Sequence, residues 1–178
     1  MILVGYLAFF DAPKKTAKVS IEALKRLKVT PKILTGDQTD VAVSICRRVG
    51  IPSETVLTGA ELDEMTDSEL SAAVERAHVF SELTPGQKVR LVSALEQNGH
   101  TVGFLGDGIN DIPALCEANV GISVDTAVDA AKDAADVVLL QKDLGVLEQG
   151  ILEGRKTFTN MLKYIKITAS SNFGNILS

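Results

Sequence analysis

The residues best suited to chemistry lie in one short stretch, Gly106–Asp111, which reads Gly-Asp-Gly-Ile-Asn-Asp. An apolar run at 101–105 precedes it directly, so two carboxylates and an amide follow an expected buried strand. Carboxylate and amide oxygens are hard ligands that suit Mg²⁺, which keeps several waters and takes further oxygens from a phosphate. The two glycines let backbone and phosphate approach closely. The stretch therefore predicts a magnesium and phosphate site, with Asp107 and Asp111 as the metal ligands.

The same stretch also has a purely structural interpretation. Asn110 or Asp111 could cap a helix that begins just after it, with Asp107 sitting only in the turn. The four-residue spacing of the two aspartates favours a site, because both side chains can point at one crevice if Asp111 begins the helix. The whole hexapeptide after an apolar strand is also a more specific signal than a pair of carboxylates alone.

Two further groups are suited to binding an anion. Lys88 falls in the first turn of a predicted helix, where the helix dipole disfavours a cation, so its position makes sense if it reaches an anion over the strand ends. An exposed lysine is otherwise simply solvated. Thr35 and Gly36 follow the apolar run 32–34 and offer a hydroxyl and a backbone N–H to a phosphate. A simple threonine turn explains the same pair.

Short apolar runs alternate with helical patterns along the chain, which indicates a doubly wound, Rossmann-like α/β fold with helices on both faces of a parallel sheet. The expected strands are 2–10, 32–34, 78–80, 101–105, 119–124 and 136–140. The expected helices are 17–24, 41–49, an acidic surface helix over 60–76, 85–97 with a capping box at its start, and a long tail from 144. Such sheets gather ligands at the carboxyl ends of their strands. Asp11, Thr35 and Asp107 all follow expected strands.

Composition describes an ordinary globular chain. Its 178 residues, 46% hydrophobic and 23% charged, suffice for one α/β domain with a core of its own. The net charge of −5 gives no electrostatic footprint for nucleic acid. Two cysteines are too few for a disulfide framework. There is neither a signal-peptide pattern nor the run of about 18 apolar residues that a membrane span needs, so we expect a soluble piece without a membrane span.

Three motifs in a fixed order carry a family resemblance: KILTGD, LTPGQK and GFLGDGINDIPAL. Together they resemble the phosphorylation domain of the P-type ATPases, which are members of the haloacid-dehalogenase-like superfamily. The similarity continues through VGISVDTAVDAAKDAADVVLL and EGRKTF to TASSNFGN, and so covers nearly the whole chain. The sequence of the last third of the chain looks most like that of the bacterial magnesium-importing P-type ATPases.

The resemblance implies a role for each candidate residue. Thr35 is expected to bind phosphoryl oxygens, and Lys88 to neutralise the phosphoryl group and its aspartyl partner. Asp107 is expected to ligate Mg²⁺, with Asn110 and Asp111 completing that corner. The two residues that follow Thr35 are expected on the phosphate and nucleotide side of the site: Gly36 and Asp37. The implied substrate is ATP, and hydrolysis is coupled to cation movement.

One departure from the family decides what the chain can do alone. The family's nucleophile is the aspartate of an Asp-Lys-Thr-Gly-Thr loop, and that pentapeptide is absent here. The resemblance places it upstream, so residues 1–143 are expected to form the distal part of a phosphorylation domain and 144–178 a helix leading to the next membrane helix. The fragment is expected to be inactive alone and to lack a central strand. Its exposed sheet edges invite a homo-oligomer.

The implied partners are the nucleotide-binding, actuator and membrane domains of the parent ATPase, at the cytoplasmic face of a bacterial inner membrane. Two alternatives remain open. The first is a soluble phosphatase of the same superfamily that uses Asp11 as its nucleophile, although Pro13 and Lys15 stand where such enzymes usually carry an acid and a threonine. The second is a non-catalytic fragment that binds magnesium or phosphate, or that regulates a full-length pump.

Overall fold

The structure, a computed structural model, describes residues 14, 16–141 and 143–177, with side chains up to residue 170. The expected strand 2–10 and Asp11 lie outside these residues. Within them, six short strands form two parallel sheets, with strand orders β1-β3-β2 and β4-β5-β6. The strands are β1 (Ile33–Leu34), β2 (Val56–Thr58), β3 (Val79–Ser81), β4 (Gly103–Leu105), β5 (Val120–Val124) and β6 (Val137–Leu139).

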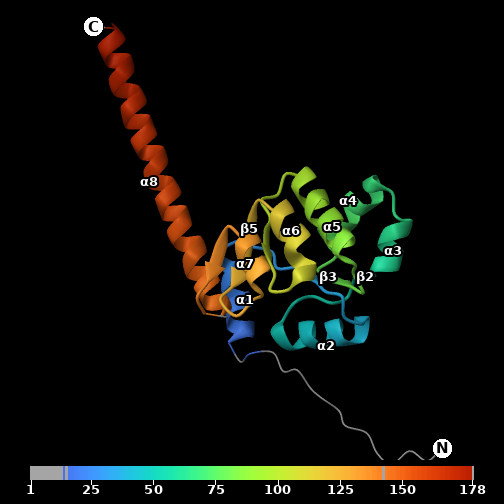
Figure 1. The fold of residues 1–178 in the computed structure, drawn as a ribbon. Coiled ribbons are helices and arrows are strands. Elements are labelled where there is room, and N and C mark those ends of the chain that lie inside the picture. The colour runs from blue at the N-terminus through green and yellow to red at the C-terminus, as the bar shows by residue number, and fades with distance from the viewer. Residues whose placement is uncertain (1–13, 15, 142, 178) are drawn as a thin grey trace, which may run out of the picture.

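Helices flank both sheets, so the predicted α/β class with parallel strands is confirmed (Figure 1). The helices are α1 (Ala17–Arg26), α2 (Thr39–Val49), α3 (Gly59–Glu64), α4 (Asp67–Arg76), α5 (Pro85–Gln97), α6 (Ile112–Glu117), α7 (Asp129–Ala134) and α8 (Leu144–Leu177), with a 3₁₀ turn, η1 (Ile109–Asp111), before α6. Helices α3 to α6 lie together on one side of the body and α2 on another, while α8 projects away from it (Figure 1).

The predicted surface helix over 60–76 is wrong in two respects. The segment forms two helices, α3 and α4, because Thr66 has extended backbone and its hydroxyl accepts the Glu69 N–H, which begins a new helix there. Both helices also bury apolar side chains rather than only lying on the surface: Leu62, Leu70, Ala73 and Val74. Strand β2, which pairs with β3 in parallel register, is likewise absent from the expected strands.

The start of α5 follows the prediction closely. The Thr84 side chain accepts the Gln87 N–H, the Gln87 side chain accepts the Thr84 N–H, and Pro85 occupies the first helical position. Buried Gln87 also donates from Nε2 to the Gly59 carbonyl at 2.9 Å, which ties α5 to the start of α3. This well-defined start matters because Lys88 lies on the first turn of α5.

Strand β3 is the most buried strand of its sheet, and every residue in it is buried. Phe80 packs into a cluster with α3, α4 and α5, and Val79 packs into a second cluster with α1 and α2. A third cluster, built on β4, β5 and β6 with α6 and α7, supports the other sheet. Burial on this scale, at roughly 25 cal/mol per Å² of apolar surface, is the main source of stability for both halves.

Strands β1 and β4 each lie at one end of their sheet, and residues in or next to them contact the hydrophobic clusters of both sheets. Leu34 of β1 packs against the cluster of the β4-β5-β6 sheet as well as against its own. Val102, which directly precedes β4, likewise contacts the clusters of both sheets. Each of these strands has a sheet partner on one side only among the residues that the structure describes.

Candidate functional site

The hexapeptide Gly106–Asp111 leaves the carboxyl end of β4, as predicted, and continues through η1 into α6. Its first glycine is buried, and its N–H donates to the Ile122 carbonyl of β5 at 3.0 Å. The buried Ser123 hydroxyl donates to the Gly106 carbonyl at 3.0 Å. A Cβ at Gly106 would lie 2.5 Å from the Asp111 Cβ, so only glycine lets this turn close. The turn is thus fixed from both sides by β5 and Asp111.

Lys88 and Asp111 form the central contact of the site. Lys88 Nζ donates to Asp111 Oδ1 at 2.6 Å, and the two side chains are only 11% and 17% exposed. The pair joins the first turn of α5 to the loop after β4. An ion pair so little exposed is screened much less than a surface pair. The lysine is therefore held over the strand ends, where it can meet an anion.

The capping alternative describes part of what the Asp111 side chain does, because its carboxylate accepts the Gly108 N–H at the start of the 3₁₀ turn η1. Asp111 stands at the N-cap of α6, yet its side chain makes no capping hydrogen bond to that helix. Its two oxygens instead face Lys88 Nζ and the Gly108 N–H, the latter at 3.4 Å. The Asp111 carboxylate is thus directed back toward the turn and Lys88.

Thr35, Gly36 and Asp37 form a compact turn at the carboxyl end of β1. The Thr35 hydroxyl donates to Asp37 Oδ2 at 2.9 Å and accepts the Asp37 N–H at 3.1 Å. A Cβ on Gly36 would lie 3.4 Å from the Leu83 carbonyl oxygen, which shows how closely the next connection approaches this turn. These contacts give the turn a defined conformation.

An open pocket of about 300 Å³ adjoins this turn. Its lining is polar and partly acidic: Gln38, Thr39, Asp40 and Glu82. The same rule that points to Thr35 and Asp107, polar residues directly after an apolar strand, would have pointed to Glu82 after the strand 78–80. Buried Ser123 carried no comparable signal, because a serine inside a strand has no special spacing.

Four of the candidate residues contact one another as two separate pairs. The structure brings Lys88 and Asp111 into contact, and it joins Thr35 with Asp37. Asp107 and Asn110 are exposed on the loop after β4. Among the described residues, no three histidine, cysteine or acidic side chains gather into a metal-binding group. Asp107, Asn110 and Asp111 carry carboxylate and amide oxygens, which are ligand types that suit Mg²⁺.

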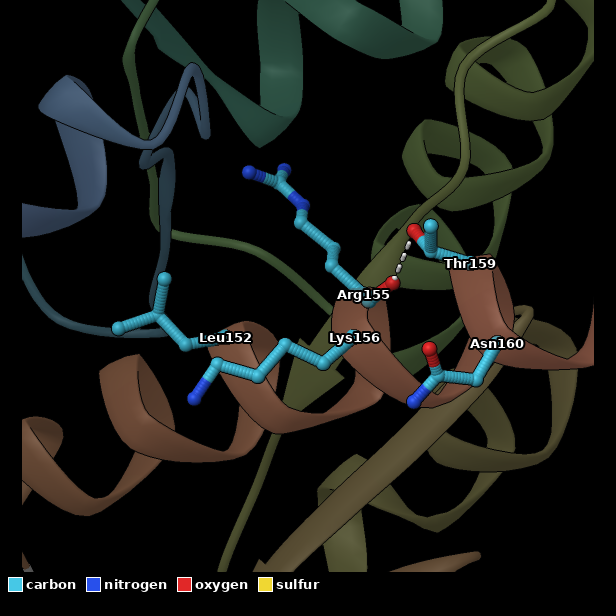
Figure 2. Close-up of a pocket in the computed structure, with 5 residues that line it drawn as sticks. All are labelled: Leu152, Arg155, Lys156, Thr159 and Asn160. Atoms are coloured by element: carbon cyan, nitrogen blue, oxygen red, sulfur yellow. Dashed lines mark hydrogen bonds between the residues drawn. The ribbon is translucent and has the colours of Figure 1, made fainter.

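A second hollow, of about 400 Å³, lies on α8 and is separate from these groups. Figure 2 shows Thr159 bonded through its hydroxyl to the Arg155 carbonyl, while the Arg155 side chain extends away from the helix. The Arg155 guanidinium donates to the Leu27 carbonyl, just after α1, at 2.7 Å. This contact anchors α8 to the end of α1, whereas the residues that line the hollow all belong to α8.

None of the helices in the described ranges has the length and apolar character needed to cross a bilayer.

The chain matches a family of known proteins over most of its length. Residues 2–119 match the model of the haloacid dehalogenase-like hydrolases. The whole chain is 53% identical to the magnesium-transporting ATPase, P-type 1, of Escherichia coli K12 and 36% identical to calcium-transporting ATPase 1 of Bacillus cereus. In both cases it spans only 20% of the relative's length.

Solved structures agree with these relatives. A zinc-transporting PIB-type ATPase in its E2.Pi state superposes with a TM-score of 0.68 at 29% identity, covering 86% of this chain and 21% of that one. The catalytic domain of the CPx-ATPase CopB-B gives a TM-score of 0.60 at 29% identity, covering 78% of this chain and 45% of that one.

Proposed function

Because this chain belongs to the haloacid dehalogenase-like hydrolase family, we propose that it is the distal part of the phosphorylation domain of a P-type ATPase that transports a cation. The similarity to a magnesium-transporting ATPase supports magnesium as that cation, and we propose import as the direction of transport. The parent ATPase transfers the γ-phosphoryl group of ATP to an aspartate that lies outside this chain. The aspartyl oxygen forms a bond to phosphorus, the bond to the bridging oxygen breaks, and ADP leaves. Hydrolysis of the aspartyl phosphate completes the cycle.

The Lys88–Asp111 ion pair is the observation that carries this proposal. Phosphoryl transfer needs positive charge that is already in place when negative charge builds up on the phosphoryl oxygens. The short contact to Asp111 holds the Lys88 ammonium at the carboxyl ends of the strands, where the phosphoryl group would bind. A lysine that served only solubility would extend into water instead.

The remaining candidates have roles that follow from their chemistry. Thr35 and Gly36 would bind phosphoryl oxygens through a hydroxyl and an N–H, with Asp37 fixing the hydroxyl. Asp107 would be the principal Mg²⁺ ligand, with Asn110 beside it, and bound Mg²⁺ would neutralise phosphate charge. Asp111 would share its carboxylate between Lys88 and the ion. We expect Asp107→Asn to weaken Mg²⁺ binding more than Asp111→Asn does.

The two facing sheet edges support a role for the rest of the parent protein. A parallel strand that ends on the nucleophilic aspartate would pair with both β1 and β4 and bring that aspartate to Thr35 and Lys88. The actuator, nucleotide-binding and membrane domains would complete the enzyme at the cytoplasmic face of the membrane. This chain alone would be inactive, and its unpaired edges would favour self-association. Sedimentation tests that association. Adding a peptide with the sequence of the missing strand should shift the oligomer to monomer, because the peptide would occupy the unpaired edges.

Labelling with γ-³²P-ATP tests the proposed function in the full-length protein. The expected product is a protein-bound phosphate that is stable in acid and released by hydroxylamine, as an acyl phosphate is. Lys88→Ala should remove most of the label, whereas Lys132→Ala, at an exposed ion pair on α7, should not. Absence of an acyl phosphate, together with phosphomonoesterase activity that depends on Asp11, would overturn the proposal in favour of a phosphatase.

A further inference from the structure

Glu82 is an exposed residue in a backbone conformation that glutamate rarely adopts. Its φ of 57° lies in the left-handed region, where Cβ crowds the following carbonyl oxygen. Among the non-glycine residues that the structure describes, only Lys28, with φ 60°, has a similar conformation. Lys28 follows the end of α1, where left-handed residues are common, and its N–H donates to the Lys25 carbonyl. Glu82 follows a strand, so a helix end does not explain its conformation.

The left-handed backbone lets two successive amides bind the turn after β1. The Glu82 N–H donates to the Asp37 carbonyl at 2.9 Å, and the Leu83 N–H donates to the Thr35 carbonyl at 3.0 Å. In the opposite direction, the Thr35 N–H donates to the Phe80 carbonyl at 3.0 Å. Both ends of the phosphate-binding turn are thereby fastened to the connection that leaves β3.

The Glu82 side chain holds the other side of the same turn. Its Oε1 accepts the Thr39 hydroxyl at 3.1 Å and lies 3.4 Å from the Thr39 N–H, at the start of α2. The Thr39 hydroxyl also lies 2.8 Å from the Ser81 hydroxyl. A carboxylate at the N-terminus of a helix is stabilised by the helix dipole. Gln38, the N-cap residue of α2, makes no side-chain capping bond, so Glu82 supplies the missing acceptor.

The connection that carries Glu82 also sets the position of Lys88. Two residues after Glu82, Thr84 caps α5, and the Lys88 N–H donates to the Thr84 carbonyl at 3.2 Å. The turn that offers the Thr35 hydroxyl and the helix that offers the Lys88 ammonium are therefore attached to the two ends of one short segment, 82–84.

We propose that Glu82 is a positioning residue that holds the Thr35 hydroxyl in register with the Lys88 ammonium through its bonds to Asp37 and Thr39. It does not touch the phosphoryl group itself. The inference rests on the proposed function and adds to it a residue that sets the geometry of the phosphoryl pocket. Glycine would adopt the same backbone without strain. The presence of glutamate at this position therefore points to its carboxylate.

Four variants of the full-length ATPase test this role. Glu82→Gly keeps the backbone conformation and removes the carboxylate, and Glu82→Gln keeps an oxygen that can accept the Thr39 hydroxyl. Thr39→Val removes the hydroxyl from the other side of the contact. Lys28→Gly relaxes the other left-handed residue, far along the chain from the site, and is the matched control. The measurements are the rate of acyl-phosphate formation at saturating ATP, inhibition by orthovanadate, and the thermal unfolding midpoint.

Glu82→Gly is expected to slow acyl-phosphate formation by about tenfold to a hundredfold, because a displacement on the order of 1 Å in a phosphoryl pocket has effects of that size. Orthovanadate should inhibit the Glu82→Gly variant more weakly, by a factor similar to the loss of rate. The thermal unfolding midpoint of this variant should stay unchanged or rise. Glu82→Gln and Lys28→Gly should behave like the unmodified protein, and Thr39→Val should be slowed less than Glu82→Gly.

The outcomes separate this inference from the function on which it rests. If the unmodified protein forms no acyl phosphate, the proposed function fails before any variant is compared. If it does, and Glu82→Gly and Thr39→Val both react at the unmodified rate, the positioning role is wrong. The role is equally wrong if Glu82→Gln is as slow as Glu82→Gly, or if slowing occurs without any change in orthovanadate inhibition.

Discussion

The two sheets carry the two parts of the candidate site on very different supports. The β1-β3-β2 sheet surrounds a fully buried β3, with a hydrophobic cluster on either side of it. In the β4-β5-β6 sheet, β5 is buried almost throughout, but Gly103 and Leu105 of β4 and Val137 of β6 are exposed. Parallel strands are normally covered on both faces. Among the described residues, the half that carries Asp107 therefore leaves more strand surface uncovered than the half that carries Thr35.

The largest expected effect concerns Lys88, whose ion pair with Asp111 joins these two halves. Lys88→Ala should slow acyl-phosphate formation in the full-length protein by about a hundredfold to a thousandfold, as loss of one preorganised electrostatic group typically does. Lys88 reaches from α5 to the loop after β4, so its loss affects both halves. Equal activity of Lys88→Ala and the unmodified protein would show that the halves do not need this bridge.

The next prediction compares one phenylalanine from each sheet. Phe80 of β3 is fully buried, whereas Phe104 of β4 is 8% exposed and has exposed neighbours. Phe80→Ala should lower the free energy of unfolding by about 3–5 kcal/mol. Phe104→Ala should cost about 1 kcal/mol less, because its surroundings can relax more easily. Urea denaturation of the chain measures both, and a larger loss at Phe104 would reverse the comparison.

A glycine provides a similar test inside the β4-β5-β6 sheet. A Cβ at Gly121 of β5 would lie 2.6 Å from the Leu115 carbonyl oxygen, so the strand and α6 would have to separate. Gly121→Ala should destabilise the chain by about 1–3 kcal/mol. Gly150→Ala on α8, where the added Cβ meets nothing within 4 Å, should instead stabilise it by about 0.5–1 kcal/mol. Thermal unfolding distinguishes the opposite signs.

The smallest expected effect is a pH dependence in the helices of the β1-β3-β2 half. The Thr58 N–H and hydroxyl both donate to Glu61 and hold the pKa of its carboxyl below the ordinary value. A lowered pKa stabilises the fold above the ordinary glutamate value of about 4.3. That contribution disappears as the pH falls through the lower, folded-state value. Glu61→Gln should flatten this acid dependence in unfolding measurements, and Glu64→Gln, exposed on the same helix, should leave it intact.

Much of this architecture follows from the sequence because local physics determines it. The reciprocal Thr84–Gln87 cap, the end of α2 at Gly50 with φ 78° and the start of α8 at Leu144 all match the expected pattern. Strand β2 was missed because its pairing with β3 depends on a chain segment that is distant in the sequence. The break at Thr66 has a local signal, a threonine three residues before a glutamate. The acidic composition around it obscured that signal.

The candidate site was predictable to the extent that it follows strand ends. The order of the motifs and the carboxyl-end rule identify Thr35, Lys88 and Asp111 as candidates. The Lys88–Asp111 contact itself depends on how α5 packs against η1 and α6, which no spacing in the sequence encodes. Glu82 follows the strand 78–80, so the same rule applies to it, but its left-handed backbone depends on Asp37 and Thr35, more than forty positions earlier in the chain.

Helix α8 has a mechanical consequence that its composition does not suggest. Its 34 residues, at about 1.5 Å per residue, make a rod of about 50 Å. Every described side chain from Leu152 to Ser170 is exposed, so the rod is attached to the body mainly at one end, through α1 and the Arg155–Leu27 contact. The part of α8 beyond Arg155 is about 33 Å long, so a rotation of about 10° at that joint would move the far tip by about 6 Å. A small rotation where α8 meets α1 would thus become a large displacement at the far end of the helix.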